Sequence, residues 1–133
     1  MLKLEIVTPE RKVIDAEVDS VTVPTASGEA GIMPQHAPLI SALKPGVVTI
    51  VTKGTTERLA VSTGFVEVSN NSVSVLTDVA ETADEVDAEA AKAERAEIEK
   101  ELSAAAALAA EDIETIRERL ELANARLFVT KLQ

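Results

Sequence analysis

The 133-residue sequence contains no cysteine, tryptophan or tyrosine, and its only aromatic side chains are Phe65 and Phe128. Without cysteine there is no disulfide framework, no thiolate metal site and no cysteine nucleophile, a composition that fits a reducing compartment. Two phenylalanines provide no platform for stacking nucleic-acid bases. The core must therefore be built from valine, isoleucine, leucine and alanine.

Positive charge is also scarce. Thirteen lysine and arginine residues face 23 acidic ones, giving a formal net charge of −10. Phosphate backbones and anionic lipids favour basic proteins, so this charge argues against nucleic-acid binding and against electrostatic docking on a membrane. No apolar run approaches the roughly 20 residues that span a bilayer. No signal or transit pattern precedes Met1-Leu2-Lys3. We expect a cytoplasmic protein that reaches a membrane only through a protein partner.

The first 80 residues consist of short alternating apolar runs separated by turn signals. Leu2, Leu4 and Ile6 alternate with polar residues, and the run 47–51 is rich in β-branched side chains. Many short strands at this spacing predict an antiparallel β-sandwich.

The composition changes after Asp78. Residues 84–123 contain no glycine and no proline. Thr82 followed by Glu85 matches a capping box, which predicts a first helix from about Asp84 to Ser103. Its apolar side is expected to comprise Val86, Ala90, Ala93, Ala96, Ile98 and Leu102.

A second helix is predicted by apolar residues at spacings of three and four, which are Ile113, Ile116, Leu120, Ala123 and Leu127. Such a seam favours folding back onto the first helix as an antiparallel hairpin. Residues 104–110 fit either a continued first helix or a turn. The sequence thus predicts an α+β chain with a sandwich domain at 1–80 and a helical hairpin domain at 81–133. Because alanine contacts bury little apolar area, the hairpin should be the less stable part and able to open.

The segment 28–38 holds two glycines, two prolines and the only histidine, which predicts a rigid loop between two strands. For His36 no nucleophile elbow and no second histidine is present, so a structural hydrogen-bonding role is favoured over catalysis. Asp15, Glu17 and Asp19 alternate along one strand, and a solvated face explains them without a calcium loop. We expect no metal and no cofactor.

Four motifs together carry a family resemblance, namely Val23-Pro24, the segment from Gly28 to Leu39, Leu43-Lys44-Pro45-Gly46, and Gly64-Phe65-Val66-Glu67-Val68. The chain resembles the epsilon subunits of F-type ATP synthases, called delta in mitochondria. The resemblance implies a non-catalytic rotor subunit of the central stalk that joins the gamma subunit to the ring of c subunits. It also implies a peripheral location on the cytoplasmic side of a bacterial membrane, or on the stromal face of the thylakoid.

The resemblance further implies two sets of contact residues. Those matching the ring-facing end of the sandwich are Glu29, Ala30, Gly31 and His36. The second set is the basic residues of the second helix, which are Arg117, Arg119, Arg126 and Lys131. They fit a solvated helix face, or, as the resemblance implies, they meet the alpha/beta catalytic head when the helices extend and can then inhibit ATP hydrolysis.

Some bacterial members of this family bind ATP on the hairpin through an Ile/Leu-Asp-x-x-Arg-Ala motif. The matching positions here are Val86, Asp87, Ala90 and Ala91, so alanine replaces the motif arginine. Of two supporting arginines in the second helix, Arg126 is present and the other position is Leu122. Each missing guanidinium removes phosphate contacts of roughly 1.5–3 kcal/mol, and no Walker-type loop replaces them. We expect no ATP binding.

The alternative hypothesis is a free-standing sensor whose hairpin closes on a small molecule. An enzyme is disfavoured, because nothing in the sequence assembles a nucleophile, a base and oxyanion donors. Co-purification with partner subunits distinguishes a stalk subunit from a sensor.

Overall fold

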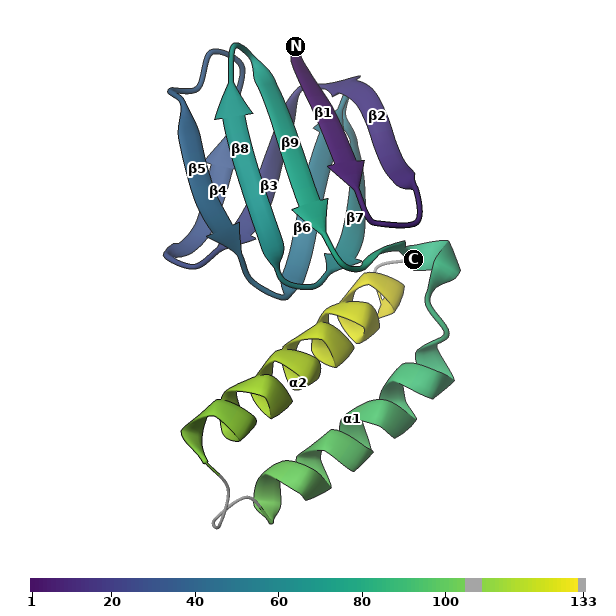
Figure 1. Cartoon of the computed structure of the whole chain (residues 1–133). Helices are drawn as coiled ribbons and strands as arrows, with labels where there is room; N and C mark the ends of the chain where they lie inside the picture. The colour runs from purple at the N-terminus through teal and green to yellow at the C-terminus, as the bar shows by residue number, and fades with distance from the viewer. Residues whose placement is uncertain (105–108, 132–133) are drawn as a thin grey trace.

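The computed structural model describes residues 1–104 and 109–131, without the side chain of Lys131. Within these residues ten strands form a sandwich, and two helices lie beneath one end of it (Figure 1). The strands are β1 (Leu2–Val7), β2 (Lys12–Val18), β3 (Ser20–Thr25), β4 (Gly28–Ile32), β5 (Leu39–Leu43), β6 (Gly46–Thr52), β7 (Thr55–Val61), β8 (Gly64–Ser69), β9 (Ser72–Thr77) and β10 (Ala80–Thr82). A short 3-10 turn, η1 (Ala83–Glu85), precedes the helices α1 (Ala88–Ser103) and α2 (Ala110–Lys131).

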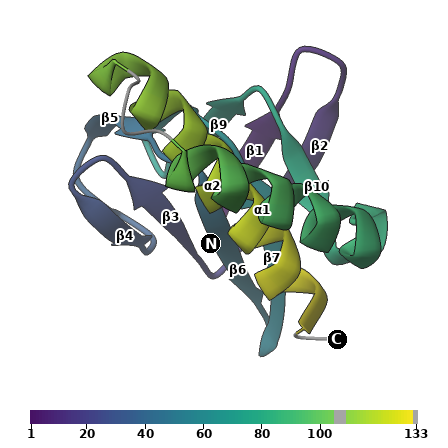
Figure 2. The same cartoon turned by 90° about the horizontal axis from the view of Figure 1, so that it is seen from below.

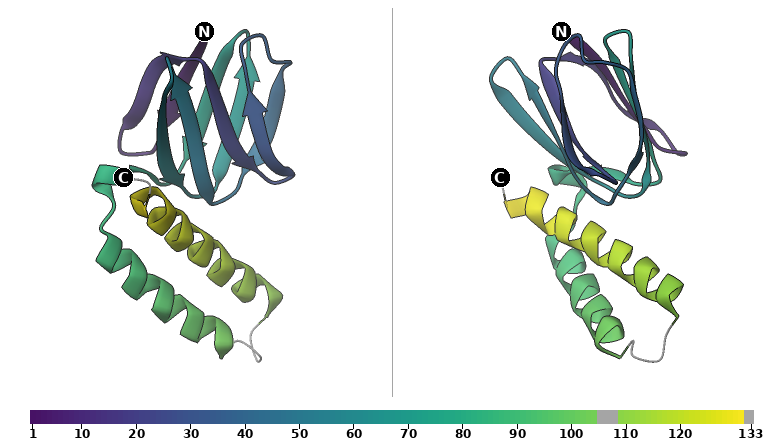
Figure 3. Two further views of the ribbon diagram at one scale, coloured as in Figure 1. Left: turned by 180° about the vertical axis from the view of Figure 1, so that it is seen from behind. Right: turned by 90° about the vertical axis from the view of Figure 1, so that its left-hand side faces the viewer.

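The strands form two layers (Figure 3). The hydrogen-bonded order is β10-β7-β6-β3-β5-β8-β9-β1-β2, with β4 paired to β3. A single residue pair, Thr25 with Leu43, joins β3 to β5 at the corner between the layers. The predicted antiparallel sandwich is confirmed, with one difference: β1 pairs with β9 in parallel, from Lys3 opposite Ser72 to Val7 opposite Leu76.

Alternation along the strands fills the space between the layers. Leu2, Leu4 and Ile6 of β1 are fully buried, and valines of the facing strands are buried with them. Successive side chains of a strand point to opposite faces of the sheet, so each apolar run contributes every second residue to the core. The sandwich core therefore needs no aromatic residue, as the composition predicted.

The two ends of the sandwich differ in what lies beside them. One end, called the distal end here, carries Met1, Asp19 and the turns at 33–38, 53–54 and 70–71 (Figure 1). The opposite end, called the helix end, carries the turns at 8–11, 26–27, 44–45 and 62–63, with the helices beneath them. Sites at the distal end are thus free of the hairpin.

The first helix begins later than the capping box predicted. Thr82 and Glu85 do interact, because the Thr82 N–H donates to Glu85 Oε1 at 3.0 Å, but they bracket only η1. Val86 then takes an extended conformation (ψ 129°), which ends the turn. Asp87 caps α1 by accepting the Ala90 N–H at 3.1 Å. The predicted start at Asp84 is therefore wrong, and the predicted end at Ser103 is correct.

The hairpin has the predicted seam on α2 and a different one on α1. Ile98, Ile116 and Ala123 form its buried cluster, with Leu102 and Leu120 packed against them. On α1 the expected alanines 90, 93 and 96 are exposed, and the buried residues are Ala91 and Ile98. Positions seven apart share one face of a helix, so the stripe through Ala91 and Ile98 leaves residues 90, 93 and 96 on other faces. The connection predicted at 104–110 falls largely on residues 105–108, which lie outside the described residues.

A second face of α2, not predicted, packs on the sandwich. Ala125 and Val129 are buried against Ala60 of β7, with Leu122 and Val47 of β6 beside them. Seen from below, α2 crosses β6 and β7 (Figure 2). In the described parts of the chain, no helix is long and apolar enough to cross a membrane.

Candidate functional site

The predicted loop at 28–38 is only half a loop. Gly28–Ile32 forms β4, which pairs with β3 from Thr25 opposite Gly28 to Val21 opposite Ile32. The loop proper runs from Met33 to Pro38. The prediction of a loop over the whole segment is wrong because the glycines lie in a hairpin strand whose register the local sequence does not show.

The residues expected to face the rotor ring are spread along this strand and loop. Glu29 lies near the helix end, where it lines a hollow of about 220 Å³ together with Lys44 and with Glu121 of α2. Gly31 is exposed, and His36 lies in the loop at the distal end. A strand rises about 3.4 Å per residue, so β4 separates Glu29 from the loop by roughly 10 Å. The four residues form one edge of the sandwich, and their docking role stays a prediction.

His36 makes local hydrogen bonds. Its Nδ1 lies 2.6 Å from the Ala37 carbonyl oxygen, and its backbone N–H donates to the Met33 carbonyl at 3.1 Å. The ring is half-buried. These contacts match the structural role that the sequence favoured for this histidine.

The outer side of the β5-β8-β9-β1 layer carries exposed apolar side chains that the sequence analysis missed. Ile40, Phe65 and Leu76 are 75%, 61% and 54% exposed. Phe65 stands opposite Ala42 on one side and Leu76 on the other. We call Ile40, Ala42, Phe65 and Leu76 the apolar face. The alternation in 64–68 was the available signal, because it places Phe65 on the side opposite the buried Val66 and Val68.

Two hollows flank the apolar face. One, of about 490 Å³, lies towards the helix end and is lined by residues that include Pro9, Phe65 and Leu76. The other, of about 360 Å³, lies towards the distal end beside Pro38 and Ile40. Large apolar side chains that project from a hollowed sheet face are typical of a protein–protein contact.

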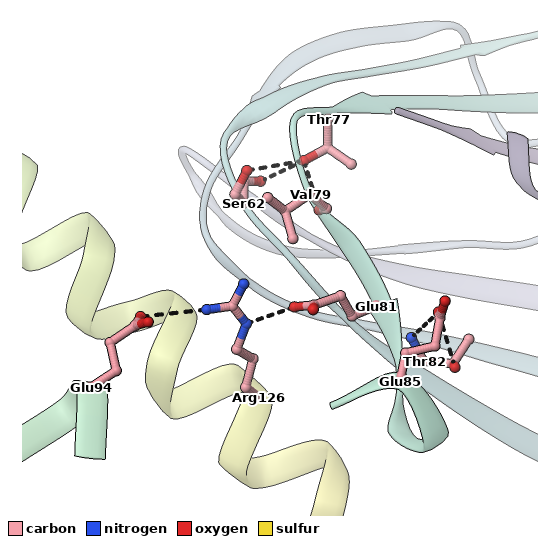
Figure 4. Close-up of polar contacts among 8 residues, drawn as sticks. All are labelled: Ser62, Thr77, Val79, Glu81, Thr82, Glu85, Glu94 and Arg126. Carbon is pink, nitrogen blue, oxygen red and sulfur yellow. Dashed lines mark hydrogen bonds and ion pairs between the residues drawn. The ribbon is translucent and has the colours of Figure 1, made fainter. Parts of the chain in front are cut away.

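The positions that match the nucleotide motif already have structural partners. Asp87 caps α1 and so offers its carboxylate to a backbone N–H. Arg126 Nε donates to Glu81 Oε1 of β10 at 2.6 Å, and its Nη1 donates to Glu94 Oε1 of α1 at 3.4 Å (Figure 4). One guanidinium thus connects β10, α1 and α2.

The cavity at this point is small and acidic. Its volume is about 170 Å³, and its lining includes Arg126 and the carboxylates of Glu81, Glu85, Asp87 and Glu94. Carboxylates in the lining of a cavity repel phosphate oxygens. Two of them, from Glu81 and Glu94, already pair with the Arg126 guanidinium. The geometry adds a second reason, beside the missing arginines, to expect no nucleotide here.

Glu85, the last residue of η1, is held by hydrogen bonds and an ion pair. Its carboxylate accepts the Thr82 N–H and hydroxyl and pairs with Arg11 from the β1–β2 turn. The Thr82 N–H, supported by the Arg11 guanidinium, holds the pKa of Glu85 below its usual 4.5. The neighbouring chain segments are held by the buried Thr77, whose Oγ1 lies 3.1 Å from the Ser62 carbonyl oxygen and 3.2 Å from that of Val79 (Figure 4). The same Oγ1 lies 3.0 Å from the Thr63 carbonyl oxygen.

The basic residues of α2 do not form a single patch in this conformation. Arg117 is exposed, and Arg119 pairs with Glu101 of α1 at 3.0 Å. Arg126 is half-buried against Glu81 and Glu94, and the side chain of Lys131 lies outside the described residues.

Two of the three alternating acidic residues, Asp15 and Asp19, contact neighbouring residues. Lys12 Nζ lies 3.2 Å from Glu5 and 3.5 Å from Asp15, contacts that raise the pKa of the Lys12 ammonium. Asp19 Oδ2 accepts the Lys53 N–H at 2.6 Å and so supports the β6–β7 turn. Among the described residues, no group of three or more histidines and acidic residues is arranged to hold a metal ion.

Comparison with known proteins relates this architecture to one family. The profile of the beta-sandwich domain of the ATP synthase delta/epsilon chain matches residues 1–83. An ATP synthase epsilon chain of Herpetosiphon aurantiacus is 41% identical over 132 residues, covering 99% of this chain and 96% of that protein. One of Desulforamulus reducens is 48% identical over 101 residues, 76% of each chain.

Solved structures share the fold. A chain of the Euglena gracilis mitochondrial ATP synthase (OSCP/F1/c-ring) has a TM-score of 0.80 at 20% identity, over 99% of this chain and 81% of that one. A chain of the Tetrahymena thermophila mitochondrial ATP synthase central stalk and c-ring has a TM-score of 0.61 at 13% identity, over 97% and 96%. The profile match over more than half of the residues, together with a relative aligned along almost the entire length, shows that this chain belongs to the delta/epsilon family of ATP synthase subunits.

Proposed function

We propose that the protein is a non-catalytic rotor subunit that couples the gamma subunit to the c-subunit ring of an ATP synthase. The observation that carries the proposal is the apolar face. A chain with a net charge of −10 exposes Phe65, Leu76 and Ile40 on one side of one layer, where only a protein partner would cover them. Chains with this fold occur in the Euglena gracilis OSCP/F1/c-ring assembly and in the Tetrahymena thermophila central stalk and c-ring, which supports the same assignment.

The two partners would use different parts of the sandwich. The apolar face and its flanking hollows suit the gamma subunit, because burying exposed aromatic and aliphatic side chains gives a stable contact. The edge formed by β4 and the loop 33–38 would meet the ring through Glu29, Ala30, Gly31 and His36. Torque then passes through packed surfaces, and no bond is made or broken. The protein would sit peripherally on the cytoplasmic side of the membrane without inserting into it.

The hairpin would regulate ATP hydrolysis as a second domain. In the conformation described here it is folded against the sandwich, through Ala125 and Val129 and through the Arg126–Glu81 ion pair. Extension would free Arg119 and Arg126 from their carboxylate partners and present them, with Arg117 and Lys131, to the alpha/beta head. A partner that binds the extended form more tightly shifts the population towards it.

Two exposed phenylalanines offer a matched test. Phe65 is 61% exposed on the apolar face, and Phe128 is 49% exposed on α2. Phe65→Glu should abolish co-purification with gamma and the catalytic head, because a carboxylate would be buried in that contact. Phe128→Glu makes the same chemical change away from the face and should leave assembly intact. Normal assembly of the Phe65→Glu protein would contradict the proposal.

Nucleotide binding is tested separately. Titration calorimetry of the isolated protein with ATP should show no binding in the micromolar range, because carboxylates line the cavity around Arg126. A micromolar dissociation constant would favour the ligand-sensing alternative. It would also require the Arg126 guanidinium to break its ion pairs with Glu81 and Glu94 and to bind a phosphate group of ATP instead.

A further inference from the structure

The turn between β8 and β9 makes contacts that a turn does not need. Asn70 and Asn71 both have left-handed backbones, with φ of 49° and 64°. They form a two-residue hairpin connection in which asparagine and glycine are the favoured residues. For the turn itself, either asparagine is exchangeable with glycine.

The Asn71 side chain nevertheless ties three segments together at the distal end. Its Oδ1 accepts the Gln35 N–H at 2.8 Å, and its Nδ2 donates to the Met1 carbonyl at 2.8 Å. Its own carbonyl accepts the Lys3 N–H at 3.1 Å. Among the described residues, the side chain of Asn70 has no hydrogen-bond partner.

The bond to Gln35 falls on the most unusual residue of the loop 33–38. Gln35 has a φ of 66°, a left-handed conformation that a residue with a side chain adopts at a cost. The following residue closes the turn, because the His36 N–H donates to the Met33 carbonyl. In this arrangement Met33 is 65% exposed at the loop surface. A fixed hydrogen bond to Gln35 favours this one loop shape over the others.

We propose that Asn71 is a positioning residue that holds the loop 33–38 in the shape that docks on the c-subunit ring. The inference rests on the proposed function, since it takes this loop as a ring contact. A loop already held in its bound shape loses less conformational freedom on docking, and this strengthens binding without any new contact. Asn71 itself need not touch the ring.

The first measurement concerns the loop alone. In the full-length protein, Asn71→Gly keeps the left-handed turn and removes both side-chain bonds, and Asn70→Gly makes the same change without removing a bond. Loss of one exposed hydrogen bond should raise amide exchange at Gln35 roughly three- to tenfold in Asn71→Gly, measured by NMR, and leave it unchanged in Asn70→Gly. Unchanged exchange in Asn71→Gly would overturn the inference.

Asn71→Asp separates the two side-chain bonds. It keeps the oxygen that accepts the Gln35 N–H and loses the donor to Met1. Gln35 exchange should therefore stay near that of the unmodified protein. Exchange as fast as in Asn71→Gly would overturn the inference, because it would place the effect in the N-terminal strand and not in the loop.

The second measurement concerns docking. In reconstituted ATP synthase, the Asn71→Gly subunit should bind the rotor roughly three- to tenfold more weakly than the unmodified subunit. ATP-driven proton pumping should then be lower when the subunit is added at a limiting concentration. The Asn70→Gly subunit should bind and support pumping normally. Faster exchange with unchanged docking would show that the loop shape does not serve ring contact and would overturn the inference. In that case Phe65→Glu still decides the proposed function by itself, since it tests the gamma contact and not the loop.

Discussion

Gly64 and Gly31 both belong to the motifs that identify the family, but a side chain would meet different surroundings at the two positions. A Cβ on Gly64 would lie 1.9 Å from the Leu76 carbonyl oxygen and 2.8 Å from the Thr77 Cα. A Cβ on Gly31 would have nothing within 4 Å. At Gly64 the strands β8 and β9 require glycine for their own packing, whereas at Gly31 the fold leaves open space beside the backbone.

Gly64→Ala should therefore lower the free energy of unfolding by about 2–3 kcal/mol, since backbone atoms have to shift. Gly31→Ala should change it by less than about 0.5 kcal/mol. Urea denaturation of both variants measures the difference. Equal stabilities would contradict the close approach of β8 and β9 at this point.

Glu85 predicts a pH dependence. Its pKa is held below 4.5 in the folded protein, first by the Thr82 N–H and then by Arg11. A carboxyl group with a lowered folded pKa stabilises the protein above its ordinary pKa and loses this contribution as the pH falls through and below 4.5. Because Glu85 is 36% exposed, solvent screening limits the contribution to roughly 1 kcal/mol or less.

Glu85→Gln should thus be less stable than the unmodified protein at pH 7 and equally stable near pH 3. Unfolding curves across this range, at low and high salt, measure the effect. Glu10→Gln, a change of the same charge in the β1–β2 turn, serves as the control. If the loss of stability in Glu85→Gln were as large at pH 3 as at pH 7, its cause would be altered packing and not the lost ionisation of Glu85.

At the scale of elements, β10 changes where the chain is divided. The sequence predicted domains at 1–80 and 81–133, and this boundary falls within β10, which spans Ala80–Thr82 and pairs with β7 through Ala80 opposite Val61 and Thr82 opposite Leu59. Ala80 is buried in the sandwich core. The strand nearest to the helices in sequence is thus part of the sandwich, and Val86 is the first residue of the linker.

A chain ending at Val86 should fold as a soluble sandwich. A chain ending at Asp78 lacks β10 and should be less stable by about 2 kcal/mol, through lost strand hydrogen bonds and the loss of Ala80 from the core. Circular dichroism and thermal unfolding compare the two. An unfolded 1–86 chain would contradict the idea that the hairpin is a separable domain.

At the scale of the whole molecule, the described residues show an apolar contact and an ion-pair centre between the hairpin and the sandwich. The apolar contact joins Ala125 and Val129 to Ala60. The ion-pair centre is Arg126, which is 21% exposed and contacts carboxylates from β10 and α1. Both contributions are limited, because small side chains bury little apolar area and the side chains of the ion-pair centre are still partly exposed. Contacts of this strength support the proposal that a partner detaches the hairpin from the sandwich.

Arg126→Gln should raise amide exchange throughout α1 and α2 by about fivefold, while the sandwich keeps its protection. Arg119→Gln removes only the pair with Glu101 inside the hairpin. Its effect should stay near the α1 C-terminus and the α2 N-terminus. Identical exchange patterns for the two variants would show that Arg126 does not hold the hairpin on the sandwich.

The sequence by itself determined the parts of this protein that rest on local periodicity. Alternation with period two predicted a sandwich with an aliphatic core, and the spacing of Ile116, Leu120 and Ala123 predicted the hairpin seam on α2. The family motifs pointed to the same fold and family. These features could be predicted because a strand or helix with one apolar face can bury it in only a few ways.

Only the tertiary structure decided which distant segments meet. The parallel pairing of β1 with β9, the strand character of Gly28–Ile32 and the partners of Arg126 all depend on residues 30 or more positions apart or on a register that turns alone do not specify. The capping box at Thr82 was locally correct, yet the extended Val86 moved the helix start to Ala88. Alternation in 64–68 places Phe65 on the strand face opposite Val66 and Val68, but only the packing of the two layers decided which of these faces is buried. Local patterns predict which residues favour burial, and the packing of the two layers and the helices determines which of these residues are buried.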